Sequence, residues 1–400
     1  VVERVLELKF GLGLFEDPYA RAFDEGETDT DSNGVGTEDH RETALRCARR
    51  SMTLLKNEGA LPLSQDLGTV FVTGPNSDSV TNQCGGWTSR EVNGSSGTTV
   101  LEGVESVFRG SVIHEEGAGI GEPKDIETAR RKSEKADASV VVLGEGAYVH
   151  EFIPPDMSHE NTGEFPTRTQ LSLPSPQQRL LRAVHGTGTP TVLVLVSGRP
   201  LAVEWAAENV PAVLMAYYPG SEGGPAVADV VFGDHNPSGS LPVSVPKSTG
   251  HLPTRFNHLP HPSVMTEKQH PPSYDPLFGF GHGLSYTEFE YEGIEISDGV
   301  VGVDGDVEVN VTLANTGDRE GRETLDLYVR DVVSSYVTPV RELAGTETVE
   351  LRPGERTTVT FELDVEDFGV VYPEGDRVTE PGEFEVSCGG LSESFVVEEE

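Results

Sequence analysis

Apolar positions follow three different patterns along the chain, and the longest stretch has the pattern of an α/β domain. Between residues 67 and 250, short continuous apolar runs alternate with segments of helical periodicity. The runs are TVFVTG, SVIHEEG, ASVVVLGE, TVLVLVSG and AVLMAYYPG, and the helical segments between and after them are VLEGVESVF, DIETARRKSEKA, PSPQQRLLRAV and GGPAVADVVFG. Continuous apolar runs of this length are typical of parallel strands that are covered on both faces. We therefore predict a doubly wound α/β sandwich domain over residues 67–250.

The pattern changes to strict alternation from residue 294 to the end of the chain. VEVNVTLANTG, ETLDLYVRDV, RELAGTETVEL, ERTTVTFELD and GEFEVSCGG alternate apolar and polar residues, with turn residues between them. This alternation predicts an antiparallel β-sandwich of about seven short strands over residues 294–400. Residues 251–293 are rich in Pro, Gly and His and are predicted to be an irregular connector between the two domains.

The first 66 residues have a third pattern. Within residues 1–22, Val2, Val5, Leu6 and Leu8 fit one face of a helix. This helix either docks alone on the next domain or is the last helix of a domain outside this chain, and we favour the second interpretation. Residues 23–66 are predicted to form an acidic, Gly-rich linker followed by an entry helix over HRETALRCARRSMTLLKNEGALPL, closed at Asn57-Glu58-Gly59.

Charge narrows the choice of partners. The 400 residues hold 29 Lys and Arg against 67 Asp and Glu, for a net charge of −38. Nucleic acids and anionic membranes need basic patches, so neither is expected as a partner. Diffuse acidity with few lysines is typical of a haloarchaeon or another halophile, because molar salt shortens the Debye length to about 3 Å. An ordinary acidic mesophilic protein remains the alternative, and localisation stays open between cytoplasmic and secreted.

Cysteine content and apolar run lengths exclude other classes. The three cysteines are widely spaced, which predicts neither a disulfide framework nor a zinc site. No apolar run approaches the roughly 20 residues of a membrane-spanning helix. The glycines of YYPGSEGGPAVADVVFGD do not match a phosphate-binding loop, and tight packing of that turn explains them better. Motifs of serine hydrolases, zinc proteases and P-loop NTPases do not occur, and we predict no cofactor.

Two loops that follow predicted strands carry candidate chemistry. After the strand ending at Thr73, Gly85 and Gly86 precede Trp87, whose ring suits stacking on a sugar. The alternative is that Trp87 only anchors its own loop.

The loop after the strand ending at Leu143 is long and holds several titratable residues: Glu145, His150, Glu151, His159, Glu160, Glu164 and Arg168. Loops at the carboxyl ends of parallel strands are where α/β proteins place their sites. A general acid needs a positioned, partly desolvated carboxyl group, and Glu164 lies close to the next helix start, with Arg168 available to orient a neighbour. The spacing of the histidines and glutamates matches no metal site, so we predict no metal. Each glutamate has the alternative interpretation of a solvated loop charge.

Taken together and in order, these stretches resemble glycoside hydrolase family 3, the β-glucosidase and β-xylosidase family. The resemblance rests on KFGLGLFEDPY, HRETALRCARRSMTLLKNEGALPL, NQCGGWT, GRPLAVEWAAENVPAVLMAYYPGSEGG, VFGDHNPSGSLPVSVP, FGFGHGLSYTEFEY, NTGDREGRETLDLYVRD and PVRELAG. It implies a (β/α)8 barrel, an α/β sandwich domain and a fibronectin type III-like sandwich, with the catalytic pocket between the first two domains. KFGLGLF looks like the last barrel helix, so we expect this chain to lack most of the barrel.

The resemblance also implies which residues act. Family members use an Asp on the barrel as nucleophile and a Glu on a loop of the second domain as acid/base. GEFPTR looks like the family's G-E-x-x-x-R loop and indicates Glu164, whereas alignment on GEGAY indicates Glu151; we favour Glu164. Trp87 matches a position that stacks on the sugar beyond the cleaved bond, and Arg168 is a further candidate for substrate binding. The nucleophile's Ser-Asp-aromatic motif does not occur in this sequence.

The prediction is a retaining, exo-acting β-glycosidase for β-glucosides or β-xylosides, in which this chain supplies the acid/base half of the site. Its partners would be a β-linked oligosaccharide or glycoside and a separate barrel chain. The alternative is a catalytically inactive carbohydrate-binding or structural protein. A nucleotide-dependent transferase is disfavoured because the sequence has no phosphate loop.

Overall fold

The computed structural model describes residues 2–18, 36–86, 88, 97–147, 169–260 and 275–399. The chain divides into two compact units, residues 1–44 and residues 45–400. In the first unit, helix α1 spans Val2–Gly11, which confirms the predicted N-terminal helix. Helix α2, Glu38–Ser51, begins in the first unit and ends in the second. None of the helices in the described ranges combines the length and the apolar character that a membrane crossing needs.

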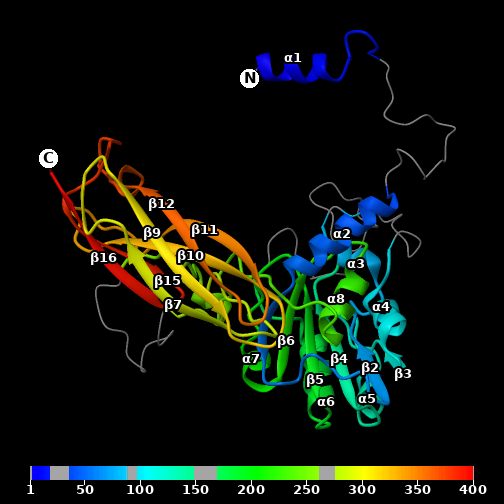
Figure 1. Cartoon of the computed structure of the whole chain (residues 1–400). Helices are drawn as coiled ribbons and strands as arrows, with labels where there is room; N and C mark the ends of the chain where they lie inside the picture. The colour runs from blue at the N-terminus through cyan, green and yellow to red at the C-terminus, as the bar shows by residue number, and fades with distance from the viewer. Residues whose placement is uncertain are drawn as a thin grey trace. The chain divides into compact units, whose positions relative to one another are not determined.

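A six-stranded sheet forms the centre of the α/β domain, in the order β1-β6-β5-β4-β2-β3 (Figure 1). The five predicted strands are present and parallel to one another. Their bounds are Thr69–Thr73 (β2), Ser111–Glu115 (β3), Ala138–Gly144 (β4), Thr191–Val196 (β5) and Ala212–Tyr217 (β6). Strands β4 and β5 are buried along their whole length, which explains their unbroken apolar sequences.

The predicted entry helix was wrong over its second half. Helix α2 ends at Ser51, and β1, Thr53–Asn57, then pairs antiparallel with β6. The reason is that Leu54 and Leu55 are both buried, on opposite faces of the sheet, and only a strand directs consecutive side chains to opposite faces. The sheet is therefore mixed rather than purely parallel.

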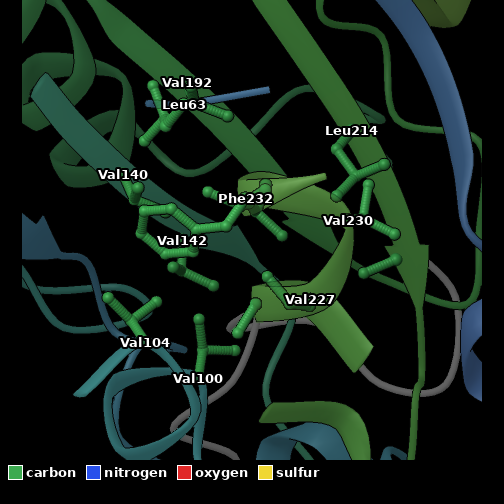
Figure 2. Packing of buried hydrophobic residues seen from close by; sticks show 14 of the residues in the cluster. Leu63, Val100, Val104, Val140, Val142, Val192, Leu214, Val227, Val230 and Phe232 are labelled. Atoms are coloured by element: carbon green, nitrogen blue, oxygen red, sulfur yellow. The ribbon is translucent and has the colours of Figure 1, made fainter. Parts of the chain in front are cut away.

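Helices cover both faces of the sheet, as a doubly wound domain requires. One core includes residues of α4 and α8, and the other includes residues of α5, α6 and α7. Figure 2 shows Val227, Val230 and Phe232 of α8 in the same cluster as Val140 and Val142 of β4. The helices span Val80–Cys84 (α3), Val100–Val107 (α4), Ile126–Ser133 (α5), Ser175–His185 (α6), Glu204–Asn209 (α7) and Gly223–Phe232 (α8). The short helices α3 and α7 were not predicted.

Helices α4 and α8 approach closely through glycines. A Cβ atom on Gly224 would lie 2.0 Å from the backbone oxygen of Thr99, and one on Gly103 would lie 2.3 Å from the backbone oxygen of Gly224. The glycine-rich turn before α8 is thus explained by close packing, as its sequence suggested.

The C-terminal domain is a β-sandwich, as predicted. One sheet has the order β11-β10-β15-β16-β8 and the other the order β12-β9-β7, with a small β13-β14 hairpin besides. The bounds are Phe289–Ile296 (β7), Val300–Gly302 (β8), Asp306–Asn315 (β9), Gly321–Asp331 (β10), Glu342–Leu351 (β11), Arg356–Asp364 (β12), Val370–Val371 (β13), Arg377–Val378 (β14), Gly382–Cys388 (β15) and Leu391–Glu398 (β16). Strand β8 pairs parallel with β16, so the sandwich is not purely antiparallel.

The described parts of the connector are held to the α/β domain by specific hydrogen bonds. Leu284 N–H donates to the carbonyl oxygen of Leu54, and Tyr286 O–H donates to that of Val230. Asn236 Oδ1 accepts from Tyr286 N–H and Ser285 O–H. Leu284 pairs with Leu54 in an isolated antiparallel β-bridge, so the connector covers part of β1, which is an edge strand of the sheet.

Candidate active site

The strand order places one topological switch point, between β2 and β4. The chain runs from β2 outward to β3, returns to β4 on the other side of β2, and continues through β5 to β6. Open α/β sheets bind ligands at the carboxyl ends of the strands at such a point. The loops that leave β2 and β4 are those in which the sequence predicted chemistry.

The predicted site residues Trp87, Glu151, Glu164 and Arg168 lie outside the described residues, as do His150, His159 and Glu160. Their assigned roles therefore stay predictions. The chain on either side of them is described, at Gly86 and Thr88 for the first loop and at Ala147 and Thr169 for the second. The geometry below concerns these flanking segments.

Glu145 is the first residue after β4, where the second loop begins, and its carboxylate is buried. Its side chain is 2 % exposed, and its contacts include three residues that lie just after strands β5 and β6. Arg199 Nε lies 3.0 Å from Oε1, Ser197 O–H donates to Oε2 at 2.9 Å, and Tyr218 O–H donates to Oε2 at 3.3 Å. Because the carboxylate is paired and hydrogen-bonded inside the fold, its geometry suits anchoring rather than proton transfer to a substrate.

Tyr218 connects Glu145 to the first loop. A Cβ atom on Gly85 would lie 2.4 Å from Cγ of Tyr218, and one on Gly198 would lie 2.5 Å from Cε2 of the same ring. The ring therefore occupies the space that both glycines leave free. Gly85 and Gly198 thus allow the backbone to lie directly against this ring. The preceding residue, Tyr217, has a positive φ of 56°, an uncommon conformation for a bulky residue that is often found near functional sites.

Two asparagines join the roots of the two loops. Asn76 Nδ2 donates to the carbonyl oxygen of Glu145 at 3.2 Å, and Asn82 Oδ1 accepts from Ala147 N–H at 3.1 Å. Asn82 Nδ2 donates to Asn76 Oδ1 at 2.8 Å. Asn76 is fully buried. The segment from Asn76 to Asn82 and the segment from Glu145 to Ala147 are thus held to one another directly.

Gln83, the next residue of α3, holds the far end of the first loop. Its side chain is fully buried, and Nε2 donates to the carbonyl oxygens of Thr98 and Gly220 at 3.0 and 3.2 Å. Oε1 accepts from Val100 N–H at 3.1 Å. Helix α3 therefore holds both the segment that begins at Gly97, through Gln83, and Ala147, through Asn82.

A serine and a histidine also meet at this edge, but not as a nucleophile and its base. Ser77 O–H donates to the carbonyl oxygen of Gly74 at 2.6 Å, and Ser77 Oγ lies 3.0 Å from His114 Nε2. Because the hydroxyl proton is used by Gly74, the histidine donates to the serine. Burial lowers the pKa of His114, which favours the neutral ring. Within the described ranges, His, Cys, Asp and Glu side chains do not gather into a group that could hold a metal.

Comparison with known proteins identifies the family. Residues 52–286 match the C-terminal domain of glycosyl hydrolase family 3, and residues 323–392 match a fibronectin type III-like domain. The chain belongs to glycoside hydrolase family 3. The family 3 match includes the whole switch-point network, from Asn76 to Tyr218.

Relatives of known name are β-glucosidases and β-xylosidases. The chain is 35% identical to a periplasmic β-glucosidase of Salmonella typhimurium, over 96% of this chain and 53% of that protein. It is 33% identical to a β-xylosidase of Formosa agariphila, over 98% of this chain and 53% of that protein. The crystal structure of the Listeria innocua β-glucosidase with glucose superimposes with a TM-score of 0.82 at 32% identity, over 98% of this chain and 54% of that one. This family 3 chain thus spans about half the length of the relatives it matches.

Sequence reasoning missed most of the residues that build this edge of the sheet. Asn76, Asn82, Gln83, Arg199 and Tyr218 were not singled out, and Glu145 was one glutamate among several. One signal was available: Glu145 directly follows a strand without a single polar side chain at its last five positions, VVVLG. A carboxylate in that position is expected to be buried and paired.

Proposed function

We propose that this chain forms part of a β-glycosidase that removes a sugar from the non-reducing end of β-glucosides or β-xylosides with retention of configuration. The observation that carries the proposal is the junction of the two candidate loops at the switch point, through Asn82 and Ala147. The named relatives, β-glucosidases and β-xylosidases, support the reaction class.

We assign the acid/base role to Glu164, with Glu151 as the alternative, and substrate contacts to Trp87 and Arg168. A retaining glycosidase needs two carboxyl groups about 5–5.5 Å apart, one that attacks and one that donates a proton. Glu145, the carboxylate at the root of this loop, is engaged by Arg199 and is not a candidate for either role. The nucleophile would be an Asp on a barrel domain, which also carries the residues that read the sugar hydroxyls.

The test is hydrolysis of p-nitrophenyl β-glucoside and β-xyloside in molar KCl. Three samples are compared: this chain alone, this chain mixed with a separately expressed family 3 barrel domain of the same organism, and the mixture with Glu164→Gln or Glu151→Gln. We expect activity in the mixture and its loss with one of the two variants.

Other outcomes separate the alternatives. Hydrolysis by the chain alone would show that it holds both carboxylates. A soluble, folded mixture without activity would contradict the proposal and favour the non-catalytic carbohydrate-binding or structural role. Loss of activity with neither glutamine variant would place the acid/base elsewhere in the chain.

We also propose that the protein works at high salt, in a halophilic organism. The net charge of −38 supports this, because its self-repulsion is screened only at high ionic strength.

A further inference from the structure

We propose that Asn82 is a positioning residue for the acid/base of this enzyme, acting through the backbone of Ala147. This inference rests on the proposed function, in which residues 148–168 carry the proton donor. It concerns a residue on a different loop, 65 positions earlier in the chain, whose contact to Ala147 joins the two loops.

The hydrogen bonds of Asn82 and Asn76 replace strand pairing at the point where it ends. The ladder between strands β2 and β4 ends at Thr73 and Val141, and one further backbone hydrogen bond follows, from Asn76 N–H to the carbonyl oxygen of Val142 at 3.4 Å. On the other side, β4 ends at Gly144 and the chain continues with Glu145 and Ala147. On the β2 side, side-chain amides take the place of a strand, accepting from Ala147 N–H and donating to the carbonyl oxygen of Glu145.

These contacts form a chain of three hydrogen bonds that all point the same way. Ala147 N–H donates to Asn82, Asn82 donates to Asn76, and Asn76 donates to the carbonyl oxygen of Glu145. Because a backbone N–H can only donate, the oxygen of Asn82 must face Ala147, and this fixes the orientation of both amides. Hydrogen bonds that point the same way along a chain strengthen one another.

The other side of the loop's root is fixed independently of Asn82. Gly144 N–H donates to Gln177 Oε1 at 2.8 Å, and Gln177 Nε2 donates back to the carbonyl oxygen of Gly144 at 2.9 Å. Glu145 N–H donates to the carbonyl oxygen of Val196 at 2.8 Å. Loss of Asn82 would therefore release Ala147 while Gly144 and Glu145 stay in place, so that the effect falls on the segment that follows.

Displacement of the acid/base should affect substrates according to how much their leaving group needs a proton. A general acid acts only when its carboxyl lies within hydrogen-bond reach of the leaving-group oxygen, so a small displacement of its loop costs proton transfer. Glycosides with a good leaving group depart without that proton, whereas those with a poor leaving group depend on it. A variant that displaces the acid therefore slows the second kind of substrate more than the first.

The experiment compares Asn82→Ala with the control Asn57→Ala in the chain mixed with its barrel domain. Asn57 also holds backbone groups with its side-chain amide, at Ala60 and Leu61, but at the opposite edge of the sheet. Each protein is assayed with 2,4-dinitrophenyl and phenyl β-glucoside across pH. We expect Asn82→Ala to lower kcat/KM for the phenyl glucoside at least tenfold more than for the dinitrophenyl glucoside, with a weakened alkaline limb of the pH profile. Asn57→Ala should leave the ratio of the two substrates unchanged.

Amide hydrogen exchange of this chain provides a readout that does not need activity. In Asn82→Ala the Ala147 amide should exchange at least tenfold faster, while the Glu145 amide keeps its protection. Unchanged exchange at Ala147 would overturn the inference, and so would faster exchange combined with equal losses on both glucosides. A wild-type mixture that hydrolyses neither glucoside would count against the proposed function, whereas the exchange data would still decide whether Asn82 anchors Ala147.

Discussion

Arg199 places its Nε–H between the two carboxylate oxygens of Glu145, 3.0 Å from Oε1 and 3.1 Å from Oε2. This pair joins the ends of β4 and β5. The glutamate side chain is 2% exposed and the arginine side chain 28% exposed.

Truncation of Arg199 should lower the free energy of unfolding. Arg199→Ala leaves a buried carboxylate without its cation, and we expect a loss of about 3 kcal/mol in the free energy of unfolding, measured by urea denaturation. Arg130→Ala is the control, because Arg130 pairs with Glu127 and Glu134 on an exposed helix surface, where an ion pair contributes little to stability. Similar small losses in both variants would contradict the anchoring role of Glu145.

Gln83 should affect substrate binding rather than proton transfer. Gln83→Ala leaves the carbonyl oxygens of Thr98 and Gly220 and the N–H of Val100 without their partner, at a cost of about 1–3 kcal/mol. Because Gln83 holds the far end of the loop of Trp87, we expect KM for aryl glucosides to rise with little change in the ratio between good and poor leaving groups. A change in that ratio as large as in Asn82→Ala would contradict this division between the two residues.

The β-sandwich should become less stable as pH rises from about 4.5 to about 7, because of Glu323. Burial raises the pKa of this carboxyl to about 7, helped by the charge of Asp326, although the Tyr291 hydroxyl that donates to it opposes the shift. Below the unfolded pKa of about 4.5 both states are protonated. Between about pH 4.5 and 7 only the unfolded state releases the proton, so stability falls by up to about 3 kcal/mol and then levels off.

Glu323→Gln isolates this contribution. Urea denaturation of the wild type and the variant is compared at pH 5 and pH 8. We expect the wild type to lose more stability than the variant over this range, since the remaining charges are common to both. A constant difference between the two proteins would show that Glu323 titrates as an exposed carboxylate does.

The contact of α4 with α8 predicts a steric effect. Gly224→Ala would bring a Cβ atom to 2.0 Å from the backbone oxygen of Thr99, so the helices must separate, at a cost of about 1–3 kcal/mol. Gly293→Ala is the control, because nothing lies within 4 Å of a Cβ atom there. Thermal denaturation of both variants gives the comparison, and equal midpoints would contradict the prediction.

Salt should stabilise the chain strongly. With a net charge of −38, raising KCl from 0.1 to 2 M should increase Tm by several degrees as the Debye length falls from about 10 Å to below 3 Å. Sucrose of equal osmolarity serves as the control for solvent exclusion. An equal rise of Tm in KCl and in sucrose would contradict the prediction, because sucrose does not screen charge.

The sequence predicted the fold well wherever burial follows a regular pattern along an element, either continuous or alternating. Strands β4 and β5 are apolar throughout because both faces are covered, and the sandwich strands alternate because one face is exposed. Strand β1 was missed because five residues directly after a helix carry too little periodicity to separate a strand from one more helical turn. Helices α3 and α7 are equally short.

The candidate site was predictable in location but not in its contacts. Strand ends and loop content indicated the two loops, since the carboxyl ends of parallel strands share one edge. The contacts of Asn82 with Ala147 and of Arg199 with Glu145 join residues 65 and 54 positions apart. Such pairs depend on strand order and register, which a single sequence does not specify.

The antiparallel strand β1 has a consequence for how the protein is made. Its ladder partner is β6, and the contact of Thr53 with Tyr217 joins residues 164 positions apart. At about 5–20 residues per second, the ribosome needs roughly 8–30 s to add the missing stretch. During that time the apolar segment of β1 has left the ribosome without its partner strand. The six-stranded sheet can therefore be completed only when translation of the α/β domain is nearly finished, however early β1 itself is made.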